Sequence, residues 1–243
     1  MHKNNNMPKN TQKAYMMHSK TDTYKKNIRK AEQNITKILT NPELRPVIEY
    51  SGGKDSIVLT DLIMKQDNNI PVWNYHPGYA QSTQTLFRST KIQKEIEYTL
   101  TTLNHTPLTM HTSNIPPLNK NGLCTDTEYR IKDYFDCLFE YMDNEQLNLE
   151  LLGIRGQESI TRRERVKQPL VHIEYDRVVS FPISHLTTDD IWAYIISNDI
   201  YYCSHYDKYA STYGYEKCRF TSHYNENDLA TGGSAYFDKI MEM

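Results

Sequence analysis

The sequence predicts an α/β fold with a doubly wound, mainly parallel sheet in a chain of 243 residues. Three observations lead to this prediction. Short apolar runs of strand length alternate with segments of helical period along the chain. A glycine pair stands directly between the first such run and the helical segment that follows it. Polar residues follow the strand-like runs, as they do where parallel strands end beside a ligand.

The N-terminal part of the chain divides into an arm and a first helix. Residues 1–20 are rich in Asn, Lys, Met and Thr without a hydrophobic period, so we expect a flexible arm that carries no catalysis. Residues 21–243 are expected to form a single domain. A helix is expected over 22–39, before Asn41-Pro42 ends it. Its apolar positions recur at spacings of three and four: Ile28, Ala31, Ile35, Ile38 and Leu39.

The first strand, a glycine turn and the next helix form the central unit. The strand is expected at 46–50 and the helix at 56–65. Further strands are expected at 70–75, 108–111, 149–153, 171–173 and 178–181, and helices at 82–100, 127–142 and 187–197. Thr187 or Thr188 can cap the last helix. From about residue 200 we expect an irregular C-terminal segment, because tyrosines, glycines and charges alternate there without a period.

Composition excludes two classes of function. The formal net charge of −2 gives no global basic field that would hold the protein on nucleic acid, so any such binding must be local. No stretch approaches the roughly 18 consecutive apolar residues that span a bilayer, and the polar N-terminus lacks the apolar core of a signal peptide. We therefore expect a cytoplasmic protein without a membrane partner.

The glycine turn has the residue types that hold a phosphate group: Ser51, Gly52, Gly53, Lys54, Asp55 and Ser56. Glycines permit close approach of the backbone, and the N–H groups at the start of the next helix attract anions. The lysine can neutralise phosphate oxygens and the serines can donate to them. The aspartate can hold Mg²⁺ or orient the loop. Since these side chains are polar, we expect them to face the surface, and a purely structural turn is the alternative.

This loop is not a Walker motif, because the Gly-x-x-x-x-Gly-Lys-Ser/Thr spacing is absent. It resembles the Ser-Gly-Gly-x-Asp-Ser hallmark of the N-type ATP pyrophosphatases, also called the PP-loop superfamily. The resemblance implies a Rossmann-like fold of the adenine nucleotide alpha hydrolase type. It also implies ATP binding with Mg²⁺, attack at the α-phosphate, and pyrophosphate as the leaving group.

Three further segments resemble the phosphoadenosine-phosphosulfate reductase-like branch, which includes sulfate adenylyltransferase small subunits and DNA phosphorothioation enzymes. They lie at 152–165, at 181–195 and at 124–132, within a resemblance that covers about 45–220. The first segment places Arg155 after a strand, where a guanidinium can clamp a phosphate or sulfate and Glu158 can pair with a nearby arginine. The resemblance also points to Lys132 and Arg163 as nucleotide-site residues.

The chain departs from this branch at two places. Residues 230–243 contain neither Cys nor His, so activity as a classical sulfonucleotide reductase is not expected. Tyr75-His76-Pro77-Gly78 stands where the family often has Asp-Thr-Gly, so the chain has no carboxylate there. His76 can substitute as a ligand or a base, or it can be a loop histidine without a role.

The four cysteines are widely spaced, without a Cys-x-x-Cys pair: Cys124, Cys137, Cys203 and Cys218. Each can be a buried apolar side chain. Alternatively, Cys124, Cys203 and Cys218 can supply three thiolates to an iron–sulfur cluster, whose ligands need to meet only in space. Cys137 is expected in the core.

Three hypotheses follow for the function. The first is an enzyme that transfers AMP from ATP to an acceptor, with Lys54, Asp55 and Arg155 as its catalytic groups. The second is a sulfurtransferase that acts on nucleic acid through a cysteine or a cluster, with a sulfur-donor protein as a partner. The third is a nucleotide-binding sensor without turnover. The sequence leaves open the acceptor, the oligomeric state, and whether the ligand is ATP or a sulfonucleotide.

Overall fold

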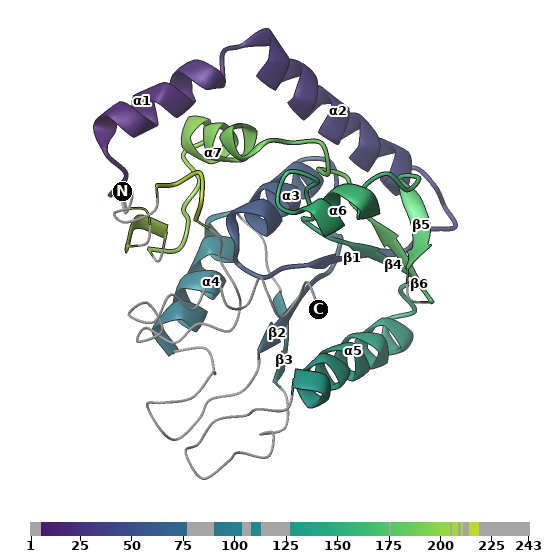
Figure 1. Ribbon diagram of the computed structural model, residues 1–243. Coiled ribbons are helices and arrows are strands. Elements are labelled where there is room, and N and C mark those ends of the chain that lie inside the picture. The colour runs from purple at the N-terminus through teal and green to yellow at the C-terminus, as the bar shows by residue number, and fades with distance from the viewer. Residues whose placement is uncertain are drawn as a thin grey trace.

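The computed structural model describes residues 6–76, 90–103, 108–112, 127–174, 176–204, 206–208, 210 and 214–218. Within these residues, six strands form one sheet with helices on both of its faces (Figure 1). This arrangement confirms the α/β fold that the alternation of strands and helices predicts.

The sheet has the strand order β3-β2-β1-β4-β6-β5. The strands are β1 (Pro46–Glu49), β2 (Val72–His76), β3 (Leu108–Thr112), β4 (Leu149–Leu151), β5 (Val171–Glu174) and β6 (Arg177–Ser180). All neighbours pair in parallel except β5 with β6, which pair antiparallel across the turn that joins them. The chain moves from β1 outward to β2 and β3, and later returns to the other side of β1 at β4. The doubly wound topology is thus confirmed, and its switch point lies between β1 and β4, where such folds bind ligands.

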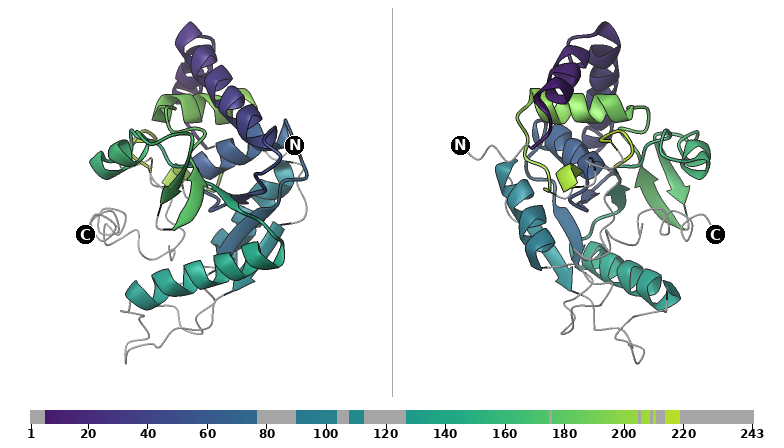
Figure 2. Two further views of the ribbon diagram at one scale, coloured as in Figure 1. Left: turned by 90° about the vertical axis from the view of Figure 1, so that its right-hand side faces the viewer. Right: turned by 60° about the vertical axis from the view of Figure 1, so that its left-hand side comes forward.

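Alternate side chains of β1 point into two separate cores. Ile48 lies in the larger core with α3 (Lys54–Met64), α4 (Thr90–Thr102) and α7 (Thr188–Ser197). Val47 points to the opposite face, where it packs with Trp73 against α5 (Thr127–Asn144). Both views of Figure 2 place α5 across the sheet from α2 (Asp22–Leu39). Because both faces of the central strands are buried, their sequences are short runs of apolar residues.

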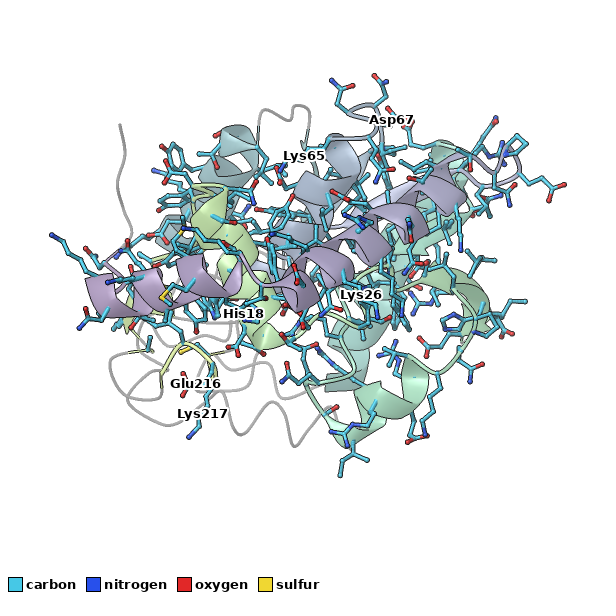
Figure 3. The ribbon with its side chains drawn as sticks, turned by 90° about the horizontal axis from the view of Figure 1, so that it is seen from above. His18, Lys26, Lys65, Asp67, Glu216 and Lys217 are labelled. Atoms are coloured by element: carbon cyan, nitrogen blue, oxygen red, sulfur yellow. The ribbon has the colours of Figure 1, made fainter. Side chains whose placement is uncertain are left out.

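The N-terminal arm differs from its expected form. Residues 9–18 are not a loose segment but form α1 (Lys9–His18), which lies against α7. Tyr15 is buried with its ring stacked 6.3 Å from that of Trp192, and His18 Nε2 lies 2.8 Å from the Asp190 carboxylate. Figure 3 shows His18 at the junction of α1 and α2. The helix has a weak apolar period, and its place depends on contacts with a segment far along the chain, which local patterns do not reveal.

Helix α7 begins as predicted. The Thr187 side chain accepts from the backbone N–H of Asp190, whose carboxylate in turn accepts from the Thr187 N–H, forming a capping box. Trp192 and Tyr194 are both buried and pack α7 into the larger core. None of the helices in the described part of the chain has the length and apolar character that would let it cross a membrane.

Candidate functional site: a phosphate loop at the strand switch point

The loop follows the carboxyl end of β1 and leads directly into α3. Gly52 has a φ of +77°, a backbone angle that favours glycine, and a Cβ there would lie 2.5 Å from Ile96 Cγ1. Gly153, just after β4, packs against the loop, because a Cβ on it would meet the backbone of Asp55 and Ser56 at 3.0 Å. Gly52 therefore lets α4 pack against the loop, and Gly153 lets the end of β4 approach the first turn of α3, whose N–H groups favour an anion.

Two serine hydroxyls hold the loop in shape. Ser51 Oγ accepts from the N–H of Gly53 at 3.2 Å and lies 3.1 Å from Ser56 Oγ. Ser56 Oγ donates to the Gly53 carbonyl at 2.9 Å and accepts from the Ser51 N–H at 3.3 Å. The sequence predicts these hydroxyls as phosphate donors, and the structure adds that they stabilise the turn itself.

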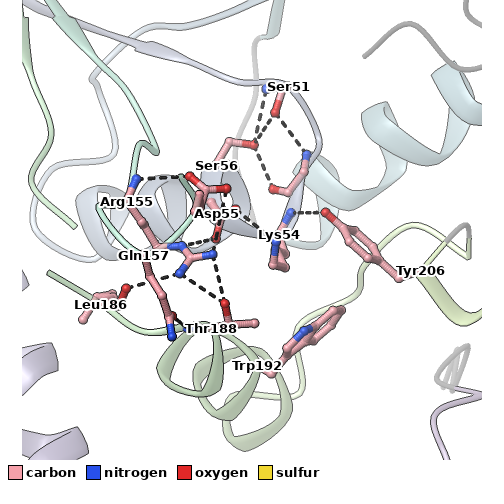
Figure 4. A network of polar contacts seen from close by, with 12 residues as sticks. Ser51, Lys54, Asp55, Ser56, Arg155, Gln157, Leu186, Thr188, Trp192 and Tyr206 are labelled. Atoms are coloured by element: carbon pink, nitrogen blue, oxygen red, sulfur yellow. Dashed lines mark hydrogen bonds and ion pairs between the residues drawn. The ribbon is translucent and has the colours of Figure 1, made fainter. Parts of the chain in front are cut away.

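Lys54, Asp55 and Arg155 meet in one ion network beside the loop (Figure 4). One carboxylate oxygen of Asp55 accepts from Arg155 Nε at 2.7 Å, and the other from Lys54 Nζ at 3.2 Å. Burial alone would raise the pKa of Asp55, but the two neighbouring cations outweigh this and hold the pKa below its ordinary value. Glu158 lies 4.0 Å from the Arg155 guanidinium and pairs with Arg162, so the extended network has three cations and two carboxylates. Its net positive charge suits a phosphate group.

The expectation that the loop side chains face the surface is wrong for Lys54 and Ser56, which are both buried. Lys54 is only 2% exposed and Arg155 only 1%, so both charges are buried and depend on Asp55 for compensation. The polar character of these residues does not reveal this, because their burial comes from the packing of α7 and the segment after it. The same contacts favour the loop-orienting role of Asp55 over the magnesium role, since both its oxygens already hold cations.

Arg155 joins the loop to the entry of α7. Besides Asp55, its guanidinium donates to the Leu186 carbonyl at 3.3 Å and lies 3.4 Å from the Thr188 hydroxyl. Burial would lower the pKa of Arg155, but Asp55 and Glu158 raise it, so the guanidinium stays charged. Arg155 thus reaches the switch point as predicted, where its guanidinium binds the loop aspartate.

A comparison with protein families gives a match to the phosphoadenosine phosphosulfate reductase domain over residues 45–220. The chain belongs to the phosphoadenosine phosphosulfate reductase domain family. The match begins just before β1 and ends after the segment that follows α7, so it includes the whole ion network. A comparison with curated proteins gave no match.

Solved structures with a similar fold include FMN adenylyltransferase from Candida glabrata in complex with ATP, at TM-score 0.53 and 14% identity over 81% of this chain and 64% of that one. The U34-tRNA thiolase NcsA from Methanococcus maripaludis, with its [4Fe-4S] cluster, gives TM-score 0.53 and 11% identity over 80% and 76%. Phosphoadenylyl-sulfate reductase from Candida auris gives TM-score 0.50 and 14% identity over 83% of this chain and 92% of that one. At these identities the likeness shows the fold. This chain spans less than two thirds of the adenylyltransferase.

The remaining predicted site residues of this reductase-domain chain lie in different surroundings. Arg163 is exposed on the short helix α6 (Ile160–Arg165), which the sequence pattern did not predict. Its neighbour Arg162 pairs with Glu158, as expected for that carboxylate. The side chains of Lys132 and His76, and the whole of Cys124, lie outside the described residues.

The segment after α7 (198–204, 206–208, 210 and 214–218) supplies residues that the sequence did not predict for the site. The Tyr206 hydroxyl accepts from the Lys54 backbone N–H at 2.8 Å, and Ser204 bonds to Glu95 on α4. The available signal was the excess of tyrosine, 19 against 6 phenylalanines. It does not identify individual residues, because their contacts span about 150 positions of sequence and have no local period.

Cys203 and Cys218 lie in this same segment and are buried. Cys203 Sγ lies 3.7 Å from the Gly52 carbonyl of the phosphate loop. Burial raises the pKa of the Cys218 thiol to about 11, and the thiol donates to the Gly214 carbonyl at 3.1 Å. The described residues contain no group of three or more metal-ligating side chains, and Cys124 lies outside them. Cys137 is half-buried against the α5 core, as expected.

A second buried charge cluster lies on the α5 face of the sheet. Glu150 on β4 is 1% exposed and accepts from Arg177 Nη1 at 2.5 Å. The Tyr134 hydroxyl of α5 donates to Glu49 at the end of β1. Burial and the nearby Glu49 carboxyl raise the pKa of Glu150 to about 9, although Arg177 lowers it. Glu150 therefore keeps its proton to a higher pH than an exposed glutamate does, in competition with its ion pair to Arg177.

Glu150→Gln is expected to make the stability less dependent on pH. Between pH 4.5 and about 9 the folded protein holds a proton on Glu150 that the unfolded chain has lost. The stabilisation by this proton is complete below pH 4.5 and lost as the pH rises towards 9, at no more than about 1.4 kcal/mol per pH unit. The glutamine variant lacks this titration. Urea unfolding of both proteins at several values in this range should show a shallower decline for the variant, and equal declines would contradict the assignment.

Proposed function

We propose that this protein binds ATP and cleaves it between the α and β phosphates, transferring AMP to an acceptor. The observation that carries the proposal is the Ser51–Ser56 loop at the strand switch point, where the start of α3 and a net positive ion network converge. The N–H groups of the first helical turn would hold the β and γ phosphates. Lys54 would neutralise the pyrophosphate as it leaves.

The proposed reaction is a substitution at the α-phosphorus. An acceptor oxygen bonds to that phosphorus while the bond to the α,β-bridging oxygen breaks, and pyrophosphate leaves with the electron pair. The acceptor loses its proton to solvent. Mg²⁺ bound to the phosphates would neutralise further charge on the leaving group. Arg155 orients Asp55, and Lys132 and Arg163 are proposed to lie near the α-phosphate or the acceptor.

The comparisons support an enzyme of this general kind. Proteins with the same fold are named as an adenylyltransferase, a tRNA thiolase and a phosphoadenylyl-sulfate reductase, and one of them is in complex with ATP. Because fold alone does not specify the reaction, the acceptor has to be identified by experiment.

The products formed from α-labelled ATP test this proposal. With Mg²⁺ and no added acceptor, water replaces the acceptor slowly, and we expect AMP and pyrophosphate. Formation of ADP and phosphate instead would overturn the proposed bond cleavage. Tight binding of ATP with no turnover across a panel of acceptors would favour the sensor hypothesis. Mass spectrometry of co-purifying nucleotides that found adenosine phosphosulfates would overturn ATP as the ligand.

Sulfur transfer is the second candidate, because Cys203 and Cys218 both lie in the segment that borders the phosphate loop. With Cys124 they would hold an iron–sulfur cluster, at which sulfide from a sulfur-donor protein would be placed to displace AMP from an adenylated nucleic acid. A protein that is coloured after anaerobic purification, with absorbance near about 400 nm, would support this candidate.

The variant with Cys124→Ser, Cys203→Ser and Cys218→Ser is expected to keep ATP binding, because the loop geometry rests on the serine and ion contacts. If the thiols hold a cluster, the variant loses iron and visible absorbance together with stability. If they are core residues, burying each hydroxyl costs about 1 to 3 kcal/mol without a spectral change. Iron content, melting temperature and ATP affinity are measured on one preparation. Loss of ATP affinity in a folded variant would contradict the expectation.

A further inference from the structure

Helix α3 begins without a side-chain cap from its own neighbourhood. Gly53 occupies the N-cap position and has no side chain that could accept from the first turn. The first N–H of the helix, that of Lys54, instead donates to the hydroxyl of Tyr206 at 2.8 Å. A residue far along the chain therefore performs the role that a local serine or aspartate usually has at a helix start.

Tyr206 is held firmly in this position. It is 2% exposed, and its ring meets Trp192 of α7 edge to face at a centroid distance of 5.2 Å. The neighbouring Asp207 accepts from the hydroxyls of Tyr202 and Tyr215 at 2.7 and 2.6 Å. Figure 4 shows Tyr206 reaching the Lys54 backbone from the side of Trp192. Such packing favours a fixed support over a group that moves when a ligand arrives.

The same side chain also faces the lysine charge. Lys54 Nζ lies 5.8 Å from the centroid of the Tyr206 ring, within the range of a cation–π interaction. Burial and the Asp55 carboxylate raise the pKa of Tyr206 well above its ordinary value, so the hydroxyl stays neutral. It thus contributes a hydrogen-bond acceptor and an aromatic face without adding a charge to the phosphate site.

We propose that Tyr206 is a positioning residue of the phosphate loop: its hydroxyl holds the first N–H of α3 and its ring faces the Lys54 ammonium, which keeps the loop in the shape that binds pyrophosphate. This inference rests on the proposed function. The hydroxyl satisfies the N–H of the first helical position and leaves those of the next positions directed at the ligand. The loop therefore has its binding shape only when the segment after α7 is docked against it.

Tyr206→Phe tests the inference, because it removes the hydroxyl and keeps the ring. Tyr194→Phe is the matched control, since it also removes a buried tyrosine hydroxyl that bonds to a carboxylate, that of Asp61, which lies near the other end of α3. For Tyr206→Phe we expect the Kd of inorganic pyrophosphate and the KM for ATP to rise about tenfold, the effect of one lost hydrogen bond, with kcat within about threefold. For Tyr194→Phe we expect both constants within about twofold of wild type.

Other outcomes separate the inference from the proposed function. Equal or tighter pyrophosphate binding by Tyr206→Phe would overturn the inference, because the hydroxyl would then be irrelevant or would compete with the ligand. Failure of the wild type to bind pyrophosphate or ATP would overturn the proposed function. In that case amide hydrogen exchange at Lys54, expected to accelerate only in Tyr206→Phe, still tests the positioning role.

If Tyr206→Phe fails to fold, Asp207→Asn provides the test, because it weakens the anchor while keeping Tyr206 intact. A rise of about threefold in the Kd of pyrophosphate is then expected, since one anchoring contact is weakened rather than lost. An unchanged Kd would count against the inference.

Discussion

Asp55→Ala is expected to lower the free energy of unfolding by about 3 to 5 kcal/mol and to abolish nucleotide binding. Lys54 and Arg155 are 2% and 1% exposed, and both pair with this carboxylate. Removing it leaves the Lys54 ammonium without its counter-ion and leaves Arg155 only the Glu158 carboxylate, 4.0 Å away. Breaking a buried ion pair from one side costs an amount of this order. Urea unfolding measures the stability, and calorimetry with ATP measures the binding.

Two comparisons make this result specific. Asp143→Ala removes an exposed carboxylate from the end of α5 and is expected to change stability by less than about 0.5 kcal/mol. Adding Arg155→Met to Asp55→Ala removes one of the stranded cations and should restore part of the lost stability. An Asp55→Ala protein as stable as wild type would show that the ion network is not formed in solution.

Arg155→Lys is expected to cost about 1.5 to 3 kcal/mol although the charge is kept. The guanidinium bonds at once to Asp55, to the Leu186 carbonyl and to Thr188, from nitrogens that point in different directions. An ammonium group on a shorter stem cannot reproduce this geometry, so at least one charge-assisted bond is lost. Unfolding experiments should show the loss of stability, and ATP affinity should fall because Asp55 no longer orients the loop.

Arg162→Lys is the matched control for this substitution. Arg162 is also paired with a carboxylate, that of Glu158, but its side chain is 36% exposed. Pairs at such exposure contribute little, so the expected change is below about 1 kcal/mol. If both lysine variants behaved alike, within about twofold of wild type in ATP affinity, Arg155 would have no special role.

The phosphate loop was predictable because its signal is local. Ser51 to Ser56 stand between a strand and a helix, and their residue types alone predict a tight turn of the kind that suits an anion. The position of Arg155 followed from the same logic, since the ends of parallel strands meet at one edge of the sheet. The interaction partners of these residues could not be predicted from the sequence. Asp55 was as suited to a metal as to an ion pair until the two buried cations were seen beside it.

The sequence by itself determined the alternation of strands and helices, the place of the loop after β1 and the cap of α7, because each depends on residues within a few positions of one another. Only the tertiary structure decided that Lys54 is buried, that α1 lies on α7, and that Tyr206 supports the start of α3. These features depend on contacts between segments far apart along the chain. Such contacts have no period in the sequence, because the packing of the whole fold brings the segments together.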